Sequence, residues 1–317
     1  RMLRSRRAFI RRILTGYRCA LLEKVALGAV MLIPLAGCSS PSGAVFDRIE
    51  PPITWPAAPK QARIVYVGEI STSGDLKSGQ NWIEGLTEGA FGRKDEHGVL
   101  TPFAVCTDDH ERLFVADTGA QVVHVFDLST RRYARWKPAA PASFTQPVGV
   151  AWDPAGRLLV SDALARRLFS FDASGKYQGE LAVGAAVKPG GLVIDPTTRR
   201  IFLADVAGHR VLVLSSDGKV IATLGSHGTE PGEFNYPTNV ALDSKGYLYV
   251  ADSLNFRIQI FNPELKLVRA IGQPGDRPGY FGRPKGIALD SENHLYVVDA
   301  EQDTVQIFDE ESHLLLY

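Results

Sequence analysis

Five aspartates recur at a nearly constant spacing, and they are the first residues in this chain to suggest chemistry. They are Asp117, Asp162, Asp205, Asp252 and Asp299. A carboxylate can act as a general acid or base, or it can bind a cation. A catalytic group is seldom needed five times, however. An aspartate that ends a strand can instead accept hydrogen bonds from turn amides or pair with an arginine. Because Arg167, Arg210 and Arg257 open the segments that follow three of them, we favour a structural role.

Functional residues of a repeated fold are sought where the copies differ. The third residue of a recurring P-x-G pattern is glycine or alanine in four of the five copies, whereas the fourth copy along the chain has Asn239. An amide both donates and accepts hydrogen bonds, which suits a polar ligand, a water cluster or a metal. The alternative is that Asn239 only bonds an adjacent loop. Together with residues expected on the same side, the ligand-binding candidates are Asn239, His209, Asn255, Arg167, Arg210 and Arg257.

Known catalytic and metal-binding spacings are missing from the sequence. The seven histidines are scattered, and there is no HxH or HExxH spacing, calcium-loop pattern, Gly-rich phosphate cradle or nucleophile elbow. Cys106 lies in an apolar segment and is interpreted as an inert thiol. We therefore assign no catalytic residue, no metal ligand and no cofactor. A single divalent metal held by residues from distant repeats stays an open alternative.

A repeat of 42 to 48 residues positions these side chains, as the spacing of its first prolines shows. Its five copies begin TPFAVCTD (101–108), QPVGVAWD (146–153), KPGGLVID (188–195), YPTNVALD (236–243) and RPKGIALD (283–290). Each copy continues with a second segment that ends in the recurring aspartate, then a third and in several copies a fourth. Short β-branched and aromatic segments between turn signals predict four antiparallel strands per copy. No helical pattern lies within them.

These copies resemble NHL repeats, in the pattern P-x-G-V-A-x-D, then L-Y-V-A-D, then R-I-Q-I-F. The resemblance covers residues 101–317, and more weakly 60–70. It implies an all-β fold, a six-bladed β-propeller of four-stranded blades, of which five blade cores are visible. We expect ARIVYVGEI (62–70) to form the outer strand of the sixth blade. The fifth copy ends at HLLLY (313–317), where its fourth strand should lie. Because no inner strands of a sixth blade follow, we interpret the chain as C-terminally truncated.

The segment 71–100 interrupts the repeats. Trp82, Ile83, Leu86 and Ala90 have the spacing of one helical face, which predicts a short helix. We favour packing of this insert against the propeller. A cap over the central channel and a contact with a partner are the alternatives.

The N-terminus has the features of an export signal. Residues 1–24 hold seven arginines and one lysine, and the apolar run VALGAVMLIPLA (25–36) follows. A helix of this length spans about 18 Å, short of the roughly 30 Å bilayer core. The sequence Leu35-Ala36-Gly37-Cys38 resembles the lipobox of bacterial lipoproteins. This resemblance implies that residues 1–37 are a signal peptide and that Cys38 carries the lipid.

Residues 38–60 are rich in proline, which predicts an extended tether between the lipid and the propeller at 61–317. The expected location is the bacterial cell envelope. Ser39 after Cys38 favours the periplasmic side of the outer membrane over the inner membrane in a Gram-negative host. Both the general export route and the twin-arginine route, suggested by Arg6-Arg7, stay open.

The net charge and the variability of the loops favour some classes of function over others. Without residues 1–24 the chain has 27 basic and 34 acidic residues, a balance of −7, which disfavours nucleic-acid binding. The favoured hypothesis is an envelope-tethered binding or scaffold protein that presents one loop face to an envelope protein or a small molecule. The alternative is a metal-dependent propeller lyase or hydrolase, lactonase-like or amidating-lyase-like. The loops in question are 118–121, 163–166, 206–209, 253–256 and 300–303.

Overall fold

The computed structural model describes residues 44–57, 59, 61–76, 97–184 and 186–317, all within one compact unit, Ser39–Tyr317. Regular structure there is almost entirely β-strand, in five four-stranded sheets and one two-stranded sheet. The predicted all-β propeller fold with five visible blades is therefore confirmed. The signal peptide predicted at 1–37, the lipidation site Cys38 and the helix predicted around Trp82 lie outside the described residues. No helix in the described part of the chain is long and apolar enough to cross a membrane.

Each four-stranded sheet is one blade and comes from one continuous segment. Blade 1 contains β3 (Pro102–Thr107), β4 (Arg112–Asp117), β5 (Val122–Asp127) and β6 (Arg132–Trp136). Blade 2 contains β7 (Pro147–Asp153), β8 (Arg157–Asp162), β9 (Arg167–Asp172) and β10 (Tyr177–Ala182). Blade 3 contains β11 (Pro189–Ile194), β12 (Ile201–Asp205), β13 (Arg210–Leu214) and β14 (Val220–Leu224).

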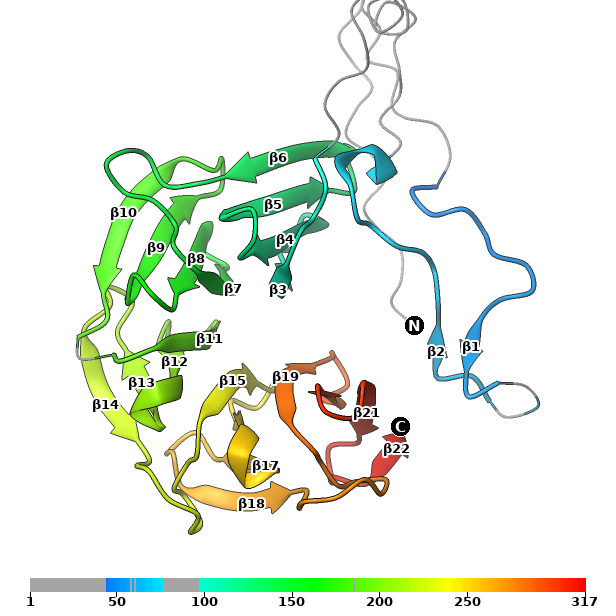
Figure 1. The fold of residues 1–317 in the computed structure, drawn as a ribbon, viewed down its shortest axis with the longest axis vertical. Helices are drawn as coiled ribbons and strands as arrows, with labels where there is room; N and C mark the ends of the chain where they lie inside the picture. The colour runs from blue at the N-terminus through cyan, green and yellow to red at the C-terminus, as the bar shows by residue number, and fades with distance from the viewer. Residues whose placement is uncertain (1–43, 58, 60, 77–96, 185) are drawn as a thin grey trace, which may run out of the picture. The chain divides into compact units, whose positions relative to one another are not determined.

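Blades 4 and 5 follow the same plan. Blade 4 contains β15 (Pro237–Leu242), β16 (Leu248–Asp252), β17 (Arg257–Phe261) and β18 (Leu267–Ile271). Blade 5 contains β19 (Pro284–Leu289), β20 (Leu295–Asp299), β21 (Thr304–Phe308) and β22 (Leu314–Leu316). Strands within a blade pair antiparallel in chain order. The first strand of each blade lies innermost, so that β3, β7, β11, β15 and β19 surround the propeller axis (Figure 1).

A proline begins every inner strand, and the pairing register shifts just after it in each blade. Proline has no N–H to donate to the ladder, and a bulge accommodates the missing bond. The small third residue of the P-x-G pattern has a separate cause. A Cβ added at Gly149 would lie 2.7 Å from the carbonyl oxygen of Gly190 in the next blade. This pattern therefore reflects close contact between neighbouring inner strands.

The hydrophobic core lies between neighbouring blades. Ala116 and Val123 of blade 1, for example, belong to one cluster with Val150 and Val160 of blade 2. Similar clusters join blades 2 and 3, blades 3 and 4, and blades 4 and 5. Because side chains alternate between the two faces of a strand, a blade between two others must be apolar on both faces. This requirement explains the nearly continuous apolar segments of the sequence.

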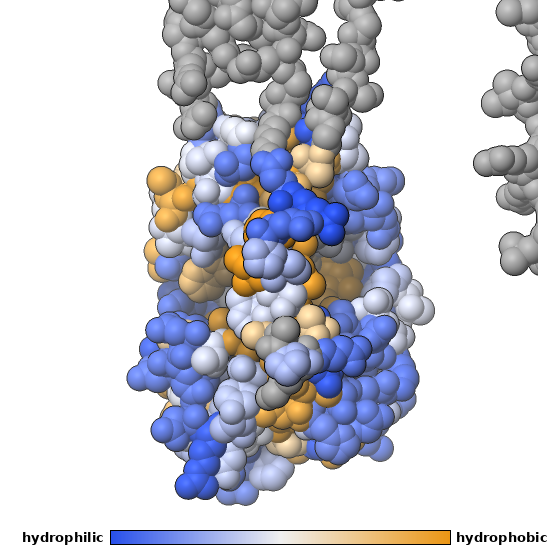
Figure 2. Space-filling view, turned by 90° about the vertical axis from the view of Figure 1, so that its right-hand side faces the viewer, coloured by the Kyte–Doolittle hydropathy of each residue, from blue (hydrophilic) through white to orange (hydrophobic). Residues whose placement is uncertain are grey.

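The outer faces of blades 1 and 5 lack such a neighbour. Val105 in β3 is 60% exposed, whereas the equivalent Val150 in blade 2 is 6% exposed. Val305 in β21 is 45% exposed, whereas the equivalent Ile258 in blade 4 is fully buried. Figure 2 views the side on which the ring is open, and apolar side chains are visible along its middle. A further sheet of the same kind would bury the apolar surface of both faces.

The expected sixth blade stays a prediction. A short strand is present within 62–70, as β2 (Ile64–Val65), but it pairs with β1 (Thr54–Trp55) in the separate two-stranded sheet. The partner strand β1 was not anticipated, since it lies in the segment interpreted as a tether. The fourth strand expected at 313–317 is confirmed as β22, which pairs with β21.

The described ends of the 71–100 insert pack against blade 1. A short 3-10 helix, η1 (Ser73–Leu76), places the fully buried Leu76 against Phe126 of β5. Val99 from the other end contacts the same cluster. These contacts agree with the prediction that the insert packs against the propeller. Val45 also joins this cluster, so the chain already contacts the propeller within the predicted tether.

Candidate functional site

The loops that join second to third strands and those that lead into the inner strands lie on one side of the propeller, which we call the loop face. The second strand of each blade ends there with the recurring aspartate. All five aspartates are fully buried. Each accepts hydrogen bonds of 2.6–3.0 Å from backbone amides just before the inner-strand proline of its own blade. This is the structural role predicted from their repetition.

The arginines that open third strands differ in what they bind. Arg210 Nε lies 3.0 Å from Asp205 Oδ2, and Arg257 Nε lies 2.8 Å from Asp252 Oδ2, as predicted. The expected pairing of Arg167 with its aspartate is wrong, because Arg167 forms an ion pair with Glu180 of β10 instead. Glu180 offers a carboxylate on the neighbouring outer strand, close to Arg167 across the ladder. Among the described residues, Asp252 of blade 4 binds more side chains than any of the other four recurring aspartates.

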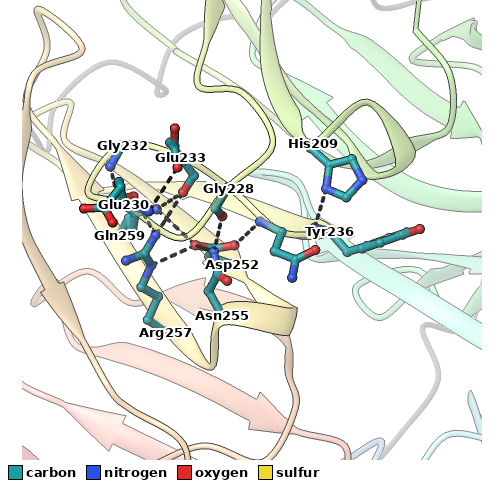
Figure 3. A network of polar contacts seen from close by, with 11 residues as sticks. His209, Gly228, Glu230, Gly232, Glu233, Tyr236, Asp252, Asn255, Arg257 and Gln259 are labelled. Carbon is teal, nitrogen blue, oxygen red and sulfur yellow. Dashed lines mark hydrogen bonds and ion pairs between the residues drawn. The ribbon is translucent and has the colours of Figure 1, made fainter.

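Asp252 is the centre of a polar network in blade 4 (Figure 3). Besides the Arg257 ion pair, its Oδ2 accepts hydrogen bonds from Asn255 Nδ2 at 2.9 Å and from Gln259 Nε2 at 3.1 Å. Its Oδ1 accepts the backbone N–H of Asn235 at 2.7 Å. A carboxylate with this many donors is held in one orientation.

The same side chains hold the loop 226–236, which leads into β15. Asn255, Arg257 and Gln259 donate to carbonyl oxygens of the loop at 2.7–3.0 Å. These acceptors belong to Gly228, Glu230 and Glu233. Two sequence-predicted site residues, Asn255 and Arg257, thus act on the loop and turn their polar groups toward it.

The loop 273–283, which leads into β19, is held in the same way. Gln306 occupies the position of Gln259, donates to the carbonyl oxygen of Tyr280 at 2.7 Å and accepts the N–H of Gly279 at 2.8 Å. Phe281 and the equivalent Phe234, which belong to these two loops, are fully buried. The loop face around blades 4 and 5 is therefore a fixed surface whose shape is set by buried polar contacts.

His209, His227 and Tyr236 form an aromatic group at the junction of blades 3 and 4, which we call the His–Tyr group. The His209 ring centroid lies 4.2 Å from that of His227 and 4.5 Å from that of Tyr236. His209 caps the 3-10 helix η2 (Val206–Gly208) in the left-handed region, with φ 53°. The side chain of Tyr236 is 43% exposed, and His227 is exposed.

His209 also changes the repeated backbone pattern of blade 4. In the other four blades the amide of the residue before the proline bonds to the recurring aspartate. In blade 4 the amide of Tyr236 donates to His209 Nδ1 at 3.2 Å (Figure 3). Burial and the neighbouring His227 lower the pKa of His209, so the neutral ring is favoured at neutral pH. With Nδ1 accepting, the ring proton is on Nε2.

Asn239 lies apart from the His–Tyr group, on the inner strand β15. Its Oδ1 accepts the N–H of Val240 at 2.7 Å. The same oxygen lies 2.5 Å from the place where a Cβ on Gly191 would stand, in the neighbouring inner strand. The amide therefore fills the space above a glycine of blade 3. Of the six predicted candidates, the structure brings Asn255, Arg257 and His209 to the loop 226–236.

Tyr236 and His227 were not among the site residues predicted from the sequence. Tyr236 occupies the position before the inner-strand proline, where the other copies have Thr101, Gln146, Lys188 and Arg283. This variability could have marked Tyr236 as a site candidate, because the position recurs in every copy while the residue type changes. No sequence pattern marks His227, since its contact with His209 depends on the path of the loop 226–236.

One trio of described residues has the composition of a cation site. Ligand atoms of Asp309, Glu311 and His313 lie within 4.8 Å of one another. The trio is in the turn between β21 and β22, away from the loop face, and His313 Nδ1 is 3.1 Å from Asp309 Oδ2. A similar contact of 2.9 Å joins His294 to Asp290 in the first turn of the same blade. Because this pairing is a repeated turn feature, we assign no metal to it.

Cys106 behaves as a thiol without special reactivity. It is a free cysteine in β3, and burial raises its pKa to about 12. A thiol with such a pKa is protonated at neutral pH and is a poor nucleophile. This agrees with the interpretation of Cys106 as inert.

Comparisons with known proteins agree with this architecture. The NHL repeat model matches residues 234–261 and 281–308, which run from the loop to the third strand of blades 4 and 5. A virginiamycin B lyase from Staphylococcus aureus superposes with a TM-score of 0.53 and 15% identity, over 68% of this chain and 69% of that chain. A chain of a nidogen/laminin complex superposes with a TM-score of 0.54 and 16% identity, over 69% of this chain and 82% of that chain. The hydrazine synthase of Kuenenia stuttgartiensis superposes with a TM-score of 0.50 and 16% identity, over 70% of this chain and 80% of that chain.

At these identities the structural similarity shows the fold alone. No curated protein matches the chain in sequence. The repeat matches and the neighbouring structures together support an NHL-repeat β-propeller, as the sequence pattern predicted.

Proposed function

We propose that this chain is an envelope-tethered propeller that binds a protein or small-molecule partner through the His–Tyr group on its loop face. The proposal rests mainly on one observation. Blade 4 departs from the repeated backbone bonding by using His209 to hold Tyr236, and the result is an exposed aromatic surface. The loop beneath this surface is fixed by the buried Asp252 network. A fixed, partly aromatic surface loses little conformational entropy when it binds.

The fold is compatible with either class of partner. Propellers of this shape include a virginiamycin B lyase with quinupristin and the nidogen/laminin complex. The chain's own residues favour a ligand with both polar and apolar parts. His209 Nε2 can donate a hydrogen bond, and the ring of Tyr236 offers an apolar surface beside it.

We also propose that Cys38 anchors the protein in the envelope. The proposal rests on the Leu35-Ala36-Gly37-Cys38 sequence at the end of an apolar run that is too short to span a bilayer. Two acyl chains give stable anchoring, which one chain does not. Replacing Cys38 by serine should move the protein from the membrane fraction to the soluble fraction of fractionated cells. An equally membrane-bound Cys38→Ser variant would rule out lipid anchoring at this residue.

The binding proposal is tested by capture from detergent-solubilised envelope with the full lipidated chain. The His227→Ala/Tyr236→Ala variant should lose most of the captured partner, because both side chains are exposed and outside the buried Asp252 network. Its melting temperature should stay close to that of the wild type. The matched control is His110→Ala/His313→Ala, which removes two exposed rings from turns on the opposite side. If both double variants capture as well as the wild type, the partner does not bind at the His–Tyr group.

A further inference from the structure

We propose that Lys188, Arg283 and Lys285 form a binding site for a small anion that carries carboxylate or phosphate groups. We call these three residues the axial cluster. They lie at the loop-face end of the propeller axis. The inference rests on the proposed function, since it places an anionic ligand on the face that we propose for binding.

The position of the axial cluster follows from the repeat. Lys188 and Arg283 immediately precede the prolines that begin β11 and β19, and Lys285 is the second residue of β19. β11, β15 and β19 are successive inner strands around the axis (Figure 1). Thr238 of β15 donates its hydroxyl to the carbonyl oxygen of Lys285 at 2.8 Å, which ties the inner strands of blades 4 and 5 together. The three basic side chains thus start from the same end of β11 and β19, the two inner strands on either side of β15.

Like charges act on one another in this cluster. Burial, together with the positive charges of Arg283 and Lys188, lowers the pKa of Lys285. The positive charges that act on Lys285 therefore come from Arg283 in its own blade and from Lys188 in blade 3, two blades away. Within the part of the chain that the structure describes, none of the three forms an ion pair. An anion between them would replace this repulsion by charge-assisted hydrogen bonds.

The nearest recurring carboxylates do not neutralise the cluster by direct contact. Asp205 and Asp299 are fully buried and accept the backbone amides of Lys188 and Arg283, at 2.9 Å and 2.8 Å. Asp205 is also paired with Arg210. Both carboxylates are therefore directed to the backbone, and the basic side chains lie outside them.

The other residues at this end of the inner strands carry no negative charge. They are Thr101, Phe103, Gln146, Val148, Gly190, Tyr236 and Thr238. The axial end is therefore positive on a body whose overall balance after residue 24 is −7. A polyanion would be repelled by that acidic body, whereas a small anion between the inner strands would be attracted by the three basic side chains. This contrast is why we infer a small ligand.

The test measures binding of inorganic phosphate and of citrate by calorimetry, with chloride used to keep the ionic strength constant. The wild-type chain should bind at least one of them saturably. The Lys188→Gln/Arg283→Gln/Lys285→Gln variant should bind about tenfold more weakly or not at all, since a tenfold change corresponds to the loss of one good charged contact. In chloride alone this variant should melt at a temperature equal to or higher than the wild type, because the repulsion is removed.

The control variant Lys176→Gln/Lys219→Gln/Lys266→Gln removes the same charge from exposed lysines in third-to-fourth strand turns. It should keep the wild-type affinity. The proposal is overturned if the wild type shows no saturable binding, if both triple variants weaken it equally, or if the axial variant melts well below the wild type. The His227→Ala variant should still bind the anion, so a failure of the His–Tyr proposal is distinguishable from a failure of this one.

Discussion

Replacing Asp252 with alanine should lower the free energy of unfolding by about 3–5 kcal/mol, the range observed when one partner of a buried ion pair is removed. Asp252 is fully buried and accepts hydrogen bonds from Arg257, Asn255, Gln259 and the backbone of Asn235. Its removal leaves the Asn235 N–H and Arg257 Nε without their acceptor, and it takes one of two acceptors from Asn255 and from Gln259. It also leaves the Arg257 guanidinium, whose side chain is 15% exposed, without its counter-ion.

Chemical denaturation of the wild type and the Asp252→Ala variant measures this loss. An Asp217→Ala variant is the control, because Asp217 lies in an exposed turn and forms a surface pair with Lys219. It should unfold like the wild type. A loss below about 1 kcal/mol for Asp252→Ala, the size of one ordinary hydrogen bond, would mean that the network does not fix the loop 226–236.

Replacing Ile258 with alanine should cost about 2–5 kcal/mol, because the side chain is fully buried in the core between blades 4 and 5. The equivalent residue of blade 5, Val305, is 45% exposed. The Val305→Ala variant should cost under about 1 kcal/mol, since much of the surface it removes is already in water.

A matched comparison uses the same substitution at an enclosed site. Val211 occupies the equivalent position in blade 3 and is fully buried. Denaturation should show a clearly larger loss for Val211→Ala than for Val305→Ala. Equal losses would contradict an open outer face on blade 5 and would show that another sheet covers Val305.

The fold could be predicted from the sequence because it repeats. Five copies of the same apolar pattern, with a proline and an aspartate at fixed positions, fix the strands and their order. The recurring aspartates were interpreted correctly because a residue present in every copy is explained by something that every copy needs. Backbone amides before the inner-strand proline are such a need, and they occur in all five blades.

The contacts between blades were harder to predict, because they depend on where side chains of different copies meet. Asn239 differs from its equivalents, yet its amide fills the space above Gly191. Arg167 matches Arg210 and Arg257 in position, but Glu180 on the adjacent outer strand binds it instead. The contact of His209 with His227 and Tyr236 requires the loop 226–236 to turn back over blade 3, and no periodicity in the sequence indicates that path.

The most direct test of the proposed binding face is site-specific photocrosslinking in intact cells. A photoreactive phenylalanine derivative at position 236 replaces an exposed aromatic residue of the His–Tyr group. The same derivative at position 110 replaces an exposed histidine in a turn on the opposite side of the propeller. We expect a defined crosslinked species from position 236 and little from position 110. Crosslinks from position 110 alone would contradict the proposed binding face, because the partner would then bind the face opposite the His–Tyr group.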